Sequence, residues 1–278
     1  MKIKKAEMAG FCFGVKRALE LTVKAAREGS GVYTLGPLIH NPQVVERLRL
    51  EGVGHFEIDR IPPDLKIAVI RTHGVSKEVN EYLNSLGIRV IDATCPFVKK
   101  AQQYAKLLHE EGYQVIILGD RNHPEVVGIK SYAGPDALVV NGPEQIERLS
   151  RKVGVVVQTT QPVEKLQELL KKAVVLCKEL KVYNTICNST AQRLKETAEL
   201  ASSVDVMLVV GGRNSANTTQ LARLSESMGV RTYHVETAEE LKDEWFEGVN
   251  SVGVTAGAST PDWIIEDIIE RLKNLVSK

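Results

Sequence analysis

The chain of 278 residues contains the same cysteine-to-glycine spacing three times. A glycine follows each cysteine after 24 residues, in the pairs Cys12 and Gly36, Cys95 and Gly119, and Cys187 and Gly211. Each cysteine ends a short β-prone stretch and begins a segment of helical character. An internal period of this kind indicates that one structural unit is repeated along the chain. We therefore predict three pseudo-equivalent units, at 1–95, 96–187 and 188–278, whose thiols come to one point.

Polar residues recur at matching places in the three units. The fourth residue after each of these glycines is His40, His123 or Ser215. Later in each unit an apolar run ends in small and polar residues, at 72–73, 159–160 and 255–259. The polar residues of these motifs are His73, Glu125, Thr159, Thr160, Asn217 and Ser259. In each unit, polar residues thus follow three strand-like runs.

The fold class follows from apolar runs that alternate with amphipathic segments. Runs rich in Val and Ile predict buried parallel strands at 66–70, 113–118, 153–157, 204–210 and 251–255. The segments between them predict helices at 98–111, 162–180, 215–228 and 261–276. This alternation is typical of an α/β fold with parallel sheets. Ligands of such sheets bind beyond the carboxyl ends of the strands, where all these motifs fall.

The composition excludes several classes of function. Hydrophobic content of 43% and charged content of 26% are ordinary for a soluble globular protein. A net charge of +1 gives no overall basic field, so we expect no nucleic-acid partner. No apolar run approaches the roughly 18 to 20 residues that span a bilayer, and the N-terminus does not resemble a signal peptide. We expect a cytoplasmic protein whose four cysteines are thiols, metal ligands or catalytic groups.

The three repeated cysteines are better metal ligands than core residues. A single cysteine at a strand end is often a small buried hydrophobe, but three in register favour a shared role. Their spacing matches no linear zinc or ferredoxin motif, so it names no metal. Three thiolates can hold three corners of a [4Fe–4S] cluster and leave one iron open. Cys177 lies on the apolar stripe of the helix predicted at 162–180, and we interpret it as a core residue.

The histidines and hydroxyls of the motifs predict an anion site. His40, His73 and His123, together with serines, threonines and helix N-termini, supply many hydrogen-bond donors for a phosphate or diphosphate. Glu125 has two interpretations. It is either an acidic residue favoured by the dipole at a helix N-terminus, or a proton donor whose pKa is raised in a closed site.

Nine motifs together resemble the IspH/LytB family of 4-hydroxy-3-methylbut-2-enyl diphosphate reductases. In chain order they are Gly-Phe-Cys12-Phe-Gly-Val, Gly-Pro-Leu-Ile-His40-Asn, Thr-His73-Gly-Val, Asp-Ala-Thr-Cys95-Pro, Asn-His123-Pro-Glu125, Gln-Thr159-Thr160-Gln, Ile-Cys187-Asn-Ser-Thr, Asn-Ser215-Ala216-Asn217 and Gly-Ala-Ser259-Thr-Pro. The resemblance covers essentially the whole chain. It implies a cloverleaf of three α/β units around a central iron–sulfur cluster.

The resemblance also implies a reaction and a role for each motif. The hydroxyl of an allylic diphosphate is removed with two electrons and two protons, giving isopentenyl and dimethylallyl diphosphate. Three cysteines hold a [4Fe–4S] cluster with one open iron, and Glu125 is the proton source, with Thr159 or Thr160 orienting the substrate hydroxyl. Residues implied in diphosphate binding are His40, His73, His123, Ser215, Ala216, Asn217 and Ser259. A ferredoxin or flavodoxin is the implied electron donor.

One position departs from the family pattern. Ala216 stands where many relatives have a second serine, so only its backbone N–H is available to the diphosphate. Two other functions stay open: a zinc-dependent hydrolase and a non-catalytic phospholigand-binding protein. The lack of a close-spaced pair of ligands counts against the zinc site.

Overall fold

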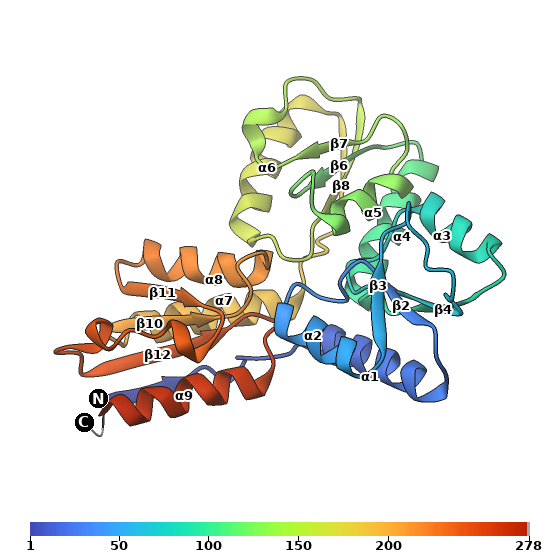
Figure 1. The fold of residues 1–278 in the computed structure, drawn as a ribbon. Coiled ribbons are helices and arrows are strands. Elements are labelled where there is room, and N and C mark those ends of the chain that lie inside the picture. The colour runs from blue at the N-terminus through green and yellow to red at the C-terminus, as the bar shows by residue number, and fades with distance from the viewer. Residues whose placement is uncertain (277–278) are drawn as a thin grey trace. The chain divides into compact units, whose positions relative to one another are not determined.

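Residues 1–276, which the computed structural model describes, form three parallel sheets of four strands each. Helices connect the strands and cover the sheets (Figure 1). The α/β fold with parallel sheets that the apolar runs predicted is therefore confirmed. Near-continuous Val and Ile runs form the central strands because both faces of each sheet are covered.

The first sheet has the strand order β3-β2-β4-β5. Its strands are β2 (Val32–Leu35), β3 (Val53–Phe56), β4 (Ile67–Ile70) and β5 (Arg89–Asp92). The helices of this repeat are α1 (Phe13–Glu28), α2 (Pro42–Leu50) and α3 (Lys77–Ser85). Leu83 of α3 packs against Ala68 and Ile70 of β4, which anchors that helix on the sheet.

The second sheet repeats this topology in the order β7-β6-β8-β9. It contains β6 (Gln114–Leu118), β7 (Leu138–Val140), β8 (Lys152–Val157) and β9 (Glu179–Val182), with helices α4 (Pro96–Glu110), α5 (Pro124–Tyr132) and α6 (Val163–Leu176) and the 3₁₀ turn η1 (Pro143–Gln145). Val115 and Ile117 of β6 pack with α4 and α5. Ile116 and Leu118, on the opposite face, pack with α6.

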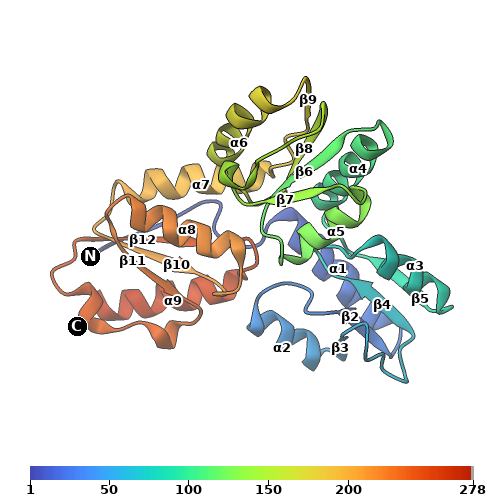
Figure 2. The same ribbon diagram turned by 90° about the horizontal axis from the view of Figure 1, so that it is seen from above.

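The third sheet combines the two ends of the chain. Its order is β1-β12-β10-β11, and it contains β1 (Lys2–Lys5), β10 (Val206–Val210), β11 (Arg231–Val235) and β12 (Ser251–Ala256). Helices α7 (Asn188–Ala201) and α8 (Ala216–Ser227) cover one face, and α9 (Asp262–Val276) covers the other (Figure 1). Two 3₁₀ turns, η2 (Ala238–Glu240) and η3 (Asp243–Phe246), follow β11. The N-terminal strand runs parallel to β12 along the edge of this sheet (Figure 2).

Each repeated cysteine follows an edge strand. Cys95 comes after β5, Cys187 after β9 and Cys12 after β1. These edge strands pair with the equivalent strands β4, β8 and β12. The sequence period therefore appears in the structure as one strand order used three times, with the last repeat closed by the N-terminal strand.

The chain folds into two compact units. Unit 1 comprises Met1–Lys16, Ile39–Arg47 and the chain from Asn188 onward, and it holds the third sheet. Unit 2 comprises Arg17–Leu38 and Leu48–Cys187, and it holds the first and second sheets. Within unit 2, the main-chain N–H of Lys77 at the start of α3 donates to Ser131 Oγ of α5 at 2.9 Å. This bond joins helices of the two repeats.

The helix predicted at 162–180 is wrong at its C-terminal end. Helix α6 ends at Leu176, and Cys177 follows it with extended backbone, φ −120° and ψ 171°. The main-chain N–H groups of Lys178 and Glu179 both donate to Arg151 O, which draws this segment alongside β8 as β9. Cys177 still packs against the core of the second sheet, as predicted, but from just beyond the helix.

Candidate functional site

The three repeated cysteines are held by the same backbone hydrogen bond. The N–H of Cys95 donates to Thr72 O at 2.9 Å, and that of Cys187 donates to Thr159 O at 2.9 Å. The N–H of Cys12 donates to Ala258 O at 3.2 Å. Each acceptor follows the strand that pairs with the cysteine's own edge strand. The thiols are half-buried, none forms a disulfide, and each lies at the start of a helix.

Two histidines of unit 2 lie side by side. The rings of His73 and His123 are 5.4 Å apart between centroids and nearly perpendicular, at 86°. His123 caps the N-terminus of α5, and its Nδ1 accepts the main-chain N–H of Glu125 at 3.2 Å. This bond assigns the ring proton of neutral His123 to Nε2, which can then donate to an anion.

Glu125 is a buried acid in unit 2. Its side chain is 2% exposed, and both carboxylate oxygens face Thr159 at the end of β8. Oε1 accepts the main-chain N–H of Thr159 at 2.6 Å, and Oε2 accepts its hydroxyl at 2.9 Å. Burial raises the pKa of Glu125 from 4.5 to about 7, and the two hydrogen bonds from Thr159 lower it less. A carboxyl group with this pKa can donate a proton near neutral pH.

The two adjacent threonines have different partners. Thr159 is buried and binds Glu125 through its N–H and its hydroxyl, while its carbonyl accepts from Cys187. The hydroxyl of Thr160 accepts the side-chain amide of Gln158 at 3.2 Å. Thr159 therefore links the buried acid to a repeated cysteine, and Thr160 does not contact the acid in any bond found among residues 1–276.

Serines of unit 1 meet at the N-terminus of α8. Ser215 caps this helix, and its Oγ accepts the main-chain N–H of Thr218 at 3.4 Å. Ser259, which follows β12, donates its hydroxyl to Ser215 Oγ at 3.5 Å. Asn217, in the first turn, has a buried side-chain oxygen with no hydrogen-bond partner among the described residues. The serine hydroxyls and the helix dipole form a suitable cradle for an anion, whereas the unpaired Asn217 oxygen is an acceptor.

Close contacts to glycine bring the loops of unit 1 together. A Cβ on Gly257 would lie 1.9 Å from Thr218 Oγ1, and a Cβ on Gly212 would lie 2.5 Å from His40 O. His40 is therefore placed against the loop between β10 and α8. Gly257 lies in one of the sequence motifs and Gly212 directly follows the repeated Gly211, but the role of neither was predicted, because only the structure shows which atoms approach them.

The two units divide the predicted site residues between them. Unit 1 contains Cys12, His40, Ser215, Ala216, Asn217 and Ser259. Unit 2 contains His73, Cys95, His123, Glu125, Thr159, Thr160 and Cys187. In both units these residues follow the carboxyl ends of strands or begin the helices after them, as the motifs predicted.

The family described as LytB protein matches residues 3–273 of the chain. The chain belongs to the LytB family. Curated relatives named 4-hydroxy-3-methylbut-2-enyl diphosphate reductase include a protein of Citrifermentans bemidjiense, 49% identical over 98% of this chain and 97% of its own length. Another, from Geobacter sulfurreducens, is 47% identical over 100% of this chain and 99% of its own length.

Two solved structures resemble this LytB chain. One, of an (E)-4-hydroxy-3-methyl-but-2-enyl diphosphate reductase described as the terminal enzyme of the non-mevalonate pathway, is 45% identical, with a TM-score of 0.74 over 99% of this chain and 100% of the other. The second is the E-1-hydroxy-2-methyl-but-2-enyl-4-diphosphate reductase of Plasmodium falciparum. It is 26% identical, with a TM-score of 0.92 over 98% of this chain and 88% of the other.

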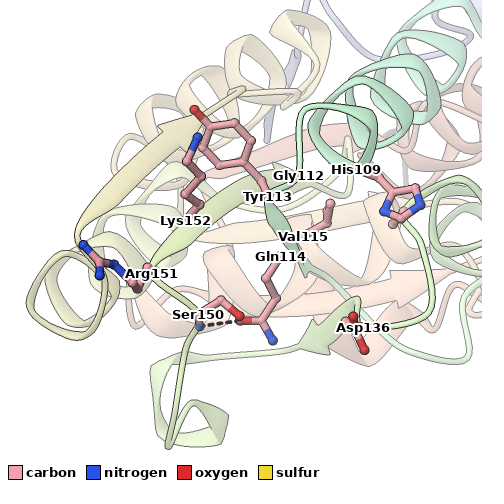
Figure 3. Close-up of a pocket in the computed structure, with 10 residues that line it drawn as sticks. His109, Gly112, Tyr113, Gln114, Val115, Asp136, Ser150, Arg151 and Lys152 are labelled. Carbon is pink, nitrogen blue, oxygen red and sulfur yellow. Dashed lines mark hydrogen bonds between the residues drawn. The ribbon is translucent and has the colours of Figure 1, made fainter.

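A groove of about 410 Å³ lies elsewhere on the second sheet of this LytB chain. Its walls include His109, Tyr113 and Lys152, and the main-chain N–H of Ser150 donates to Gln114 Oε1 at 2.8 Å (Figure 3). The groove borders the start of β6 and of β8, whereas the site residues follow the ends of these strands. It is therefore separate from the candidate site. Among residues 1–276, no helix has both the length and the apolar character to cross a membrane.

Proposed function

We propose that this chain catalyses the reductive dehydroxylation of 4-hydroxy-3-methylbut-2-enyl diphosphate. Two electrons and two protons enter, the C–O bond breaks, and the hydroxyl leaves as water. The products are isopentenyl and dimethylallyl diphosphate, which differ in the carbon that receives the second proton. Relatives at 47% and 49% identity carry the name of this reductase and support the assignment. The structural observation that carries it is the buried Glu125, whose pKa of about 7 suits proton donation.

The three repeated cysteines would hold a [4Fe–4S] cluster. Three thiols at helix N-termini that form no disulfide are soft donors of the type that such clusters require, which supports the fit. Three protein ligands, Cys12, Cys95 and Cys187, would leave one iron without a side chain. The cluster, when bound, supplies the electrons for breaking the C–O bond.

Hydrogen-bond donors would bind the diphosphate. His40, His73, His123, Ser215, Asn217 and Ser259 contribute side chains, and Ala216 contributes its main-chain N–H. The helix dipole of α8 and the Nε2–H of His123 both favour a bound anion. These contacts to the diphosphate also hold the allylic end of the substrate in place. Binding energy from the diphosphate, remote from the reacting carbon, therefore orients that carbon.

Glu125 and Thr159 would deliver the proton to the departing hydroxyl. When Glu125 is protonated, its Oε2 donates to Thr159 Oγ, which lies 2.9 Å away. The threonine hydroxyl is then free to donate to the substrate oxygen. Thr159 therefore relays the proton, and Thr160 stays a predicted substrate contact.

Metal analysis and product analysis test this function together. Protein purified without oxygen is expected to contain about four irons and four sulfides per chain. With a chemical one-electron reductant it should convert the allylic diphosphate to the two isoprenoid diphosphates, which mass spectrometry detects. Bound zinc in place of iron, with hydrolysis of the diphosphate, would instead establish the hydrolase. A ferredoxin or flavodoxin as the electron donor, and a cytoplasmic location, stay predictions.

A further inference from the structure

The segments that lead into the three cysteines leave their sheets before the cysteine is reached. We call residues 6–12, 92–95 and 183–187 the cysteine loops. Strand β1 ends at Lys5, β5 at Asp92 and β9 at Val182, so the loops have few ladder bonds to hold them. In each case the loop is contacted by a side chain from a helix that starts just after another of the repeated cysteines.

Arg193 of α7 holds the first cysteine loop. It is 1% exposed, and its guanidinium donates to three main-chain carbonyls. Nη1 donates to Met8 O and, at 2.8 Å, to Ala256 O, while Nη2 donates to Gly10 O at 3.0 Å. Because Ala256 ends β12, this one side chain fastens the loop of Cys12 to the strand that leads to Ser259.

Glu196, one turn further along α7, binds main-chain N–H groups of the same loop. Its carboxylate accepts the main-chain N–H of Met8 at 2.9 Å and that of Glu7. Helix α7 thus binds both the N–H and the carbonyl of Met8. These side chains take the place of the strand partners that the loop lacks.

Arg17 of α1 makes the equivalent contact in unit 2. Its Nη1 donates to Thr94 O at 3.3 Å, and its Nη2 donates to Asp92 O at 3.4 Å. Both acceptors lie in the loop that ends at Cys95. This loop is further fixed by an internal bond from the Thr94 N–H to Asp92 Oδ1 at 2.9 Å.

An aromatic pair makes the contact in the remaining repeat. Tyr104 of α4 stacks on Tyr183 with a centroid distance of 3.9 Å and an interplanar angle of 5°. Tyr183 begins the loop that ends at Cys187. Its main-chain N–H donates to Val155 O at 2.9 Å, so the backbone of the residue that Tyr104 covers is held against β8.

The three contacts form a closed cycle along the chain. Helix α1 starts after Cys12 and contacts the loop of Cys95, and α4 starts after Cys95 and contacts the loop of Cys187. Helix α7 starts after Cys187 and contacts the loop of Cys12. We propose that Arg17, Tyr104 and Arg193 are positioning residues that hold the cysteine loops in place for the iron–sulfur cluster. This proposal rests on the proposed function, because it concerns retention of that cluster.

Arginine suits this role for a geometric reason. A guanidinium has five donors in a fixed plane and can bind three carbonyls at once, whereas an ammonium is a compact group on a flexible stem. Loss of a residue that orients a metal ligand typically lowers metal affinity about 10-fold to 100-fold. We expect a loss of metal affinity of this size when one of the positioning residues is replaced, although the thiol itself is intact.

The test is iron release from the holoprotein under anaerobic conditions, with a chelator in excess. Arg193→Met and Arg17→Met are expected to release iron about 10-fold faster than wild type, and Tyr104→Leu faster by a smaller factor. Arg193→Lys should fall between Arg193→Met and wild type. Matched controls are Arg223→Met on the exposed side of α8 and Tyr82→Leu, whose side chain is 46% exposed. Both should release iron at the wild-type rate.

A second readout separates positioning from general stability. The reduction potential of the bound cluster should shift in the variants of Arg17, Tyr104 and Arg193 and not in the controls. It is measured well below the unfolding temperature. Variants with native circular dichroism, control-like iron release and an unchanged potential would overturn the proposal. If Arg193→Met does not fold, Arg193→Lys and Arg17→Met decide the matter. A wild-type protein that binds no iron and sulfide overturns the proposed function itself, before any variant is made.

Discussion

The chemistry of Glu125 is set by its surroundings. An exposed glutamate at a helix N-terminus keeps a low pKa, because water and the helix dipole stabilise its charge. Glu125 is in the first turn of α5, yet burial raises its pKa to about 7. The two hydrogen bonds from Thr159 stabilise the charged carboxylate, so both protonation states of Glu125 exist near neutral pH.

Glu125→Gln tests the acid directly. Glutamine keeps the size of the side chain but cannot release a proton, so turnover should fall by about 100-fold or more. Iron content and substrate binding should stay at wild-type levels, because the substitution leaves the thiols and the anion cradle intact. Steady-state kinetics and substrate titration measure the two quantities. Near wild-type turnover would exclude Glu125 as the proton donor.

The raised pKa of Glu125 also predicts how stability depends on pH. Between pH 4.5 and about 7 the folded protein keeps a proton on Glu125 that the unfolded chain has lost. Raising the pH through this window therefore destabilises the fold, by about 3 kcal/mol in total. Urea unfolding of the metal-free protein at pH 5 and pH 8 should show this loss for wild type and a smaller loss for Glu125→Gln. Equal losses in both proteins would mean that Glu125 is not buried as a neutral acid.

The hydrogen-bond partners of single residues could not be predicted from the sequence. The sequence predicted Glu125 as a candidate acid and left Thr159 and Thr160 as alternatives. In the structure their partners differ: Thr159 turns its N–H and hydroxyl toward Glu125 of α5, and Thr160 turns toward Gln158. Which of the two orients the substrate stays a prediction. Glu125 and Thr159 are 34 residues apart in the sequence, so their spacing did not indicate that they form a pair.

At the scale of elements, every predicted strand is buried, but burial was not sufficient for prediction, because β2 is also buried and was missed. The predicted strands correspond to β4, β6, β8, β10 and β12, which are buried along nearly their whole length. The edge strands β1, β5 and β9, which lead to the cysteines, were not predicted. Their residues are largely exposed or half-buried, so they lack the apolar run that marks a central strand.

The packing of α8 against the loop after β12 gives an element-scale prediction. A methyl group on Gly257 would overlap Thr218 Oγ1, so Gly257→Ala should push the N-terminus of α8 away from Ser259. We expect a loss of about 1 to 3 kcal/mol in stability and weaker binding of the diphosphate. Gly29→Ala is the matched control, because nothing lies within 4 Å of the added methyl group. Thermal unfolding and titration with inorganic diphosphate measure both effects, and equal behaviour of the two variants would contradict the contact.

At the scale of the whole molecule, the threefold period was predicted from three cysteines and their glycines. The boundaries at 1–95, 96–187 and 188–278 stay a prediction, and β1 adds a detail that they lack. This strand belongs to the third sheet although it begins the chain. No local pattern could assign Lys2–Lys5 to that sheet, since its partner β12 lies some 250 residues further along the sequence.

The three repeated thiols lead to a prediction about unfolding. A cluster held by Cys12, Cys95 and Cys187 binds the folded protein and not the unfolded chain, so removal of iron should lower the stability of the fold. Ligand binding to the folded state contributes about 4 kcal/mol at a thousandfold excess over the dissociation constant.

Serine in place of any one of these three cysteines should therefore reduce iron content and lower the thermal midpoint to that of the metal-free protein. Cys177→Ser is the matched control, because this thiol packs in the core of the second sheet and lies outside the repeat. It should keep about four irons per chain, with at most a modest loss of stability. Iron analysis and calorimetry on the same samples check both results. If Cys177→Ser loses its iron while Cys12→Ser keeps it, the assignment of the ligands to the threefold repeat is wrong.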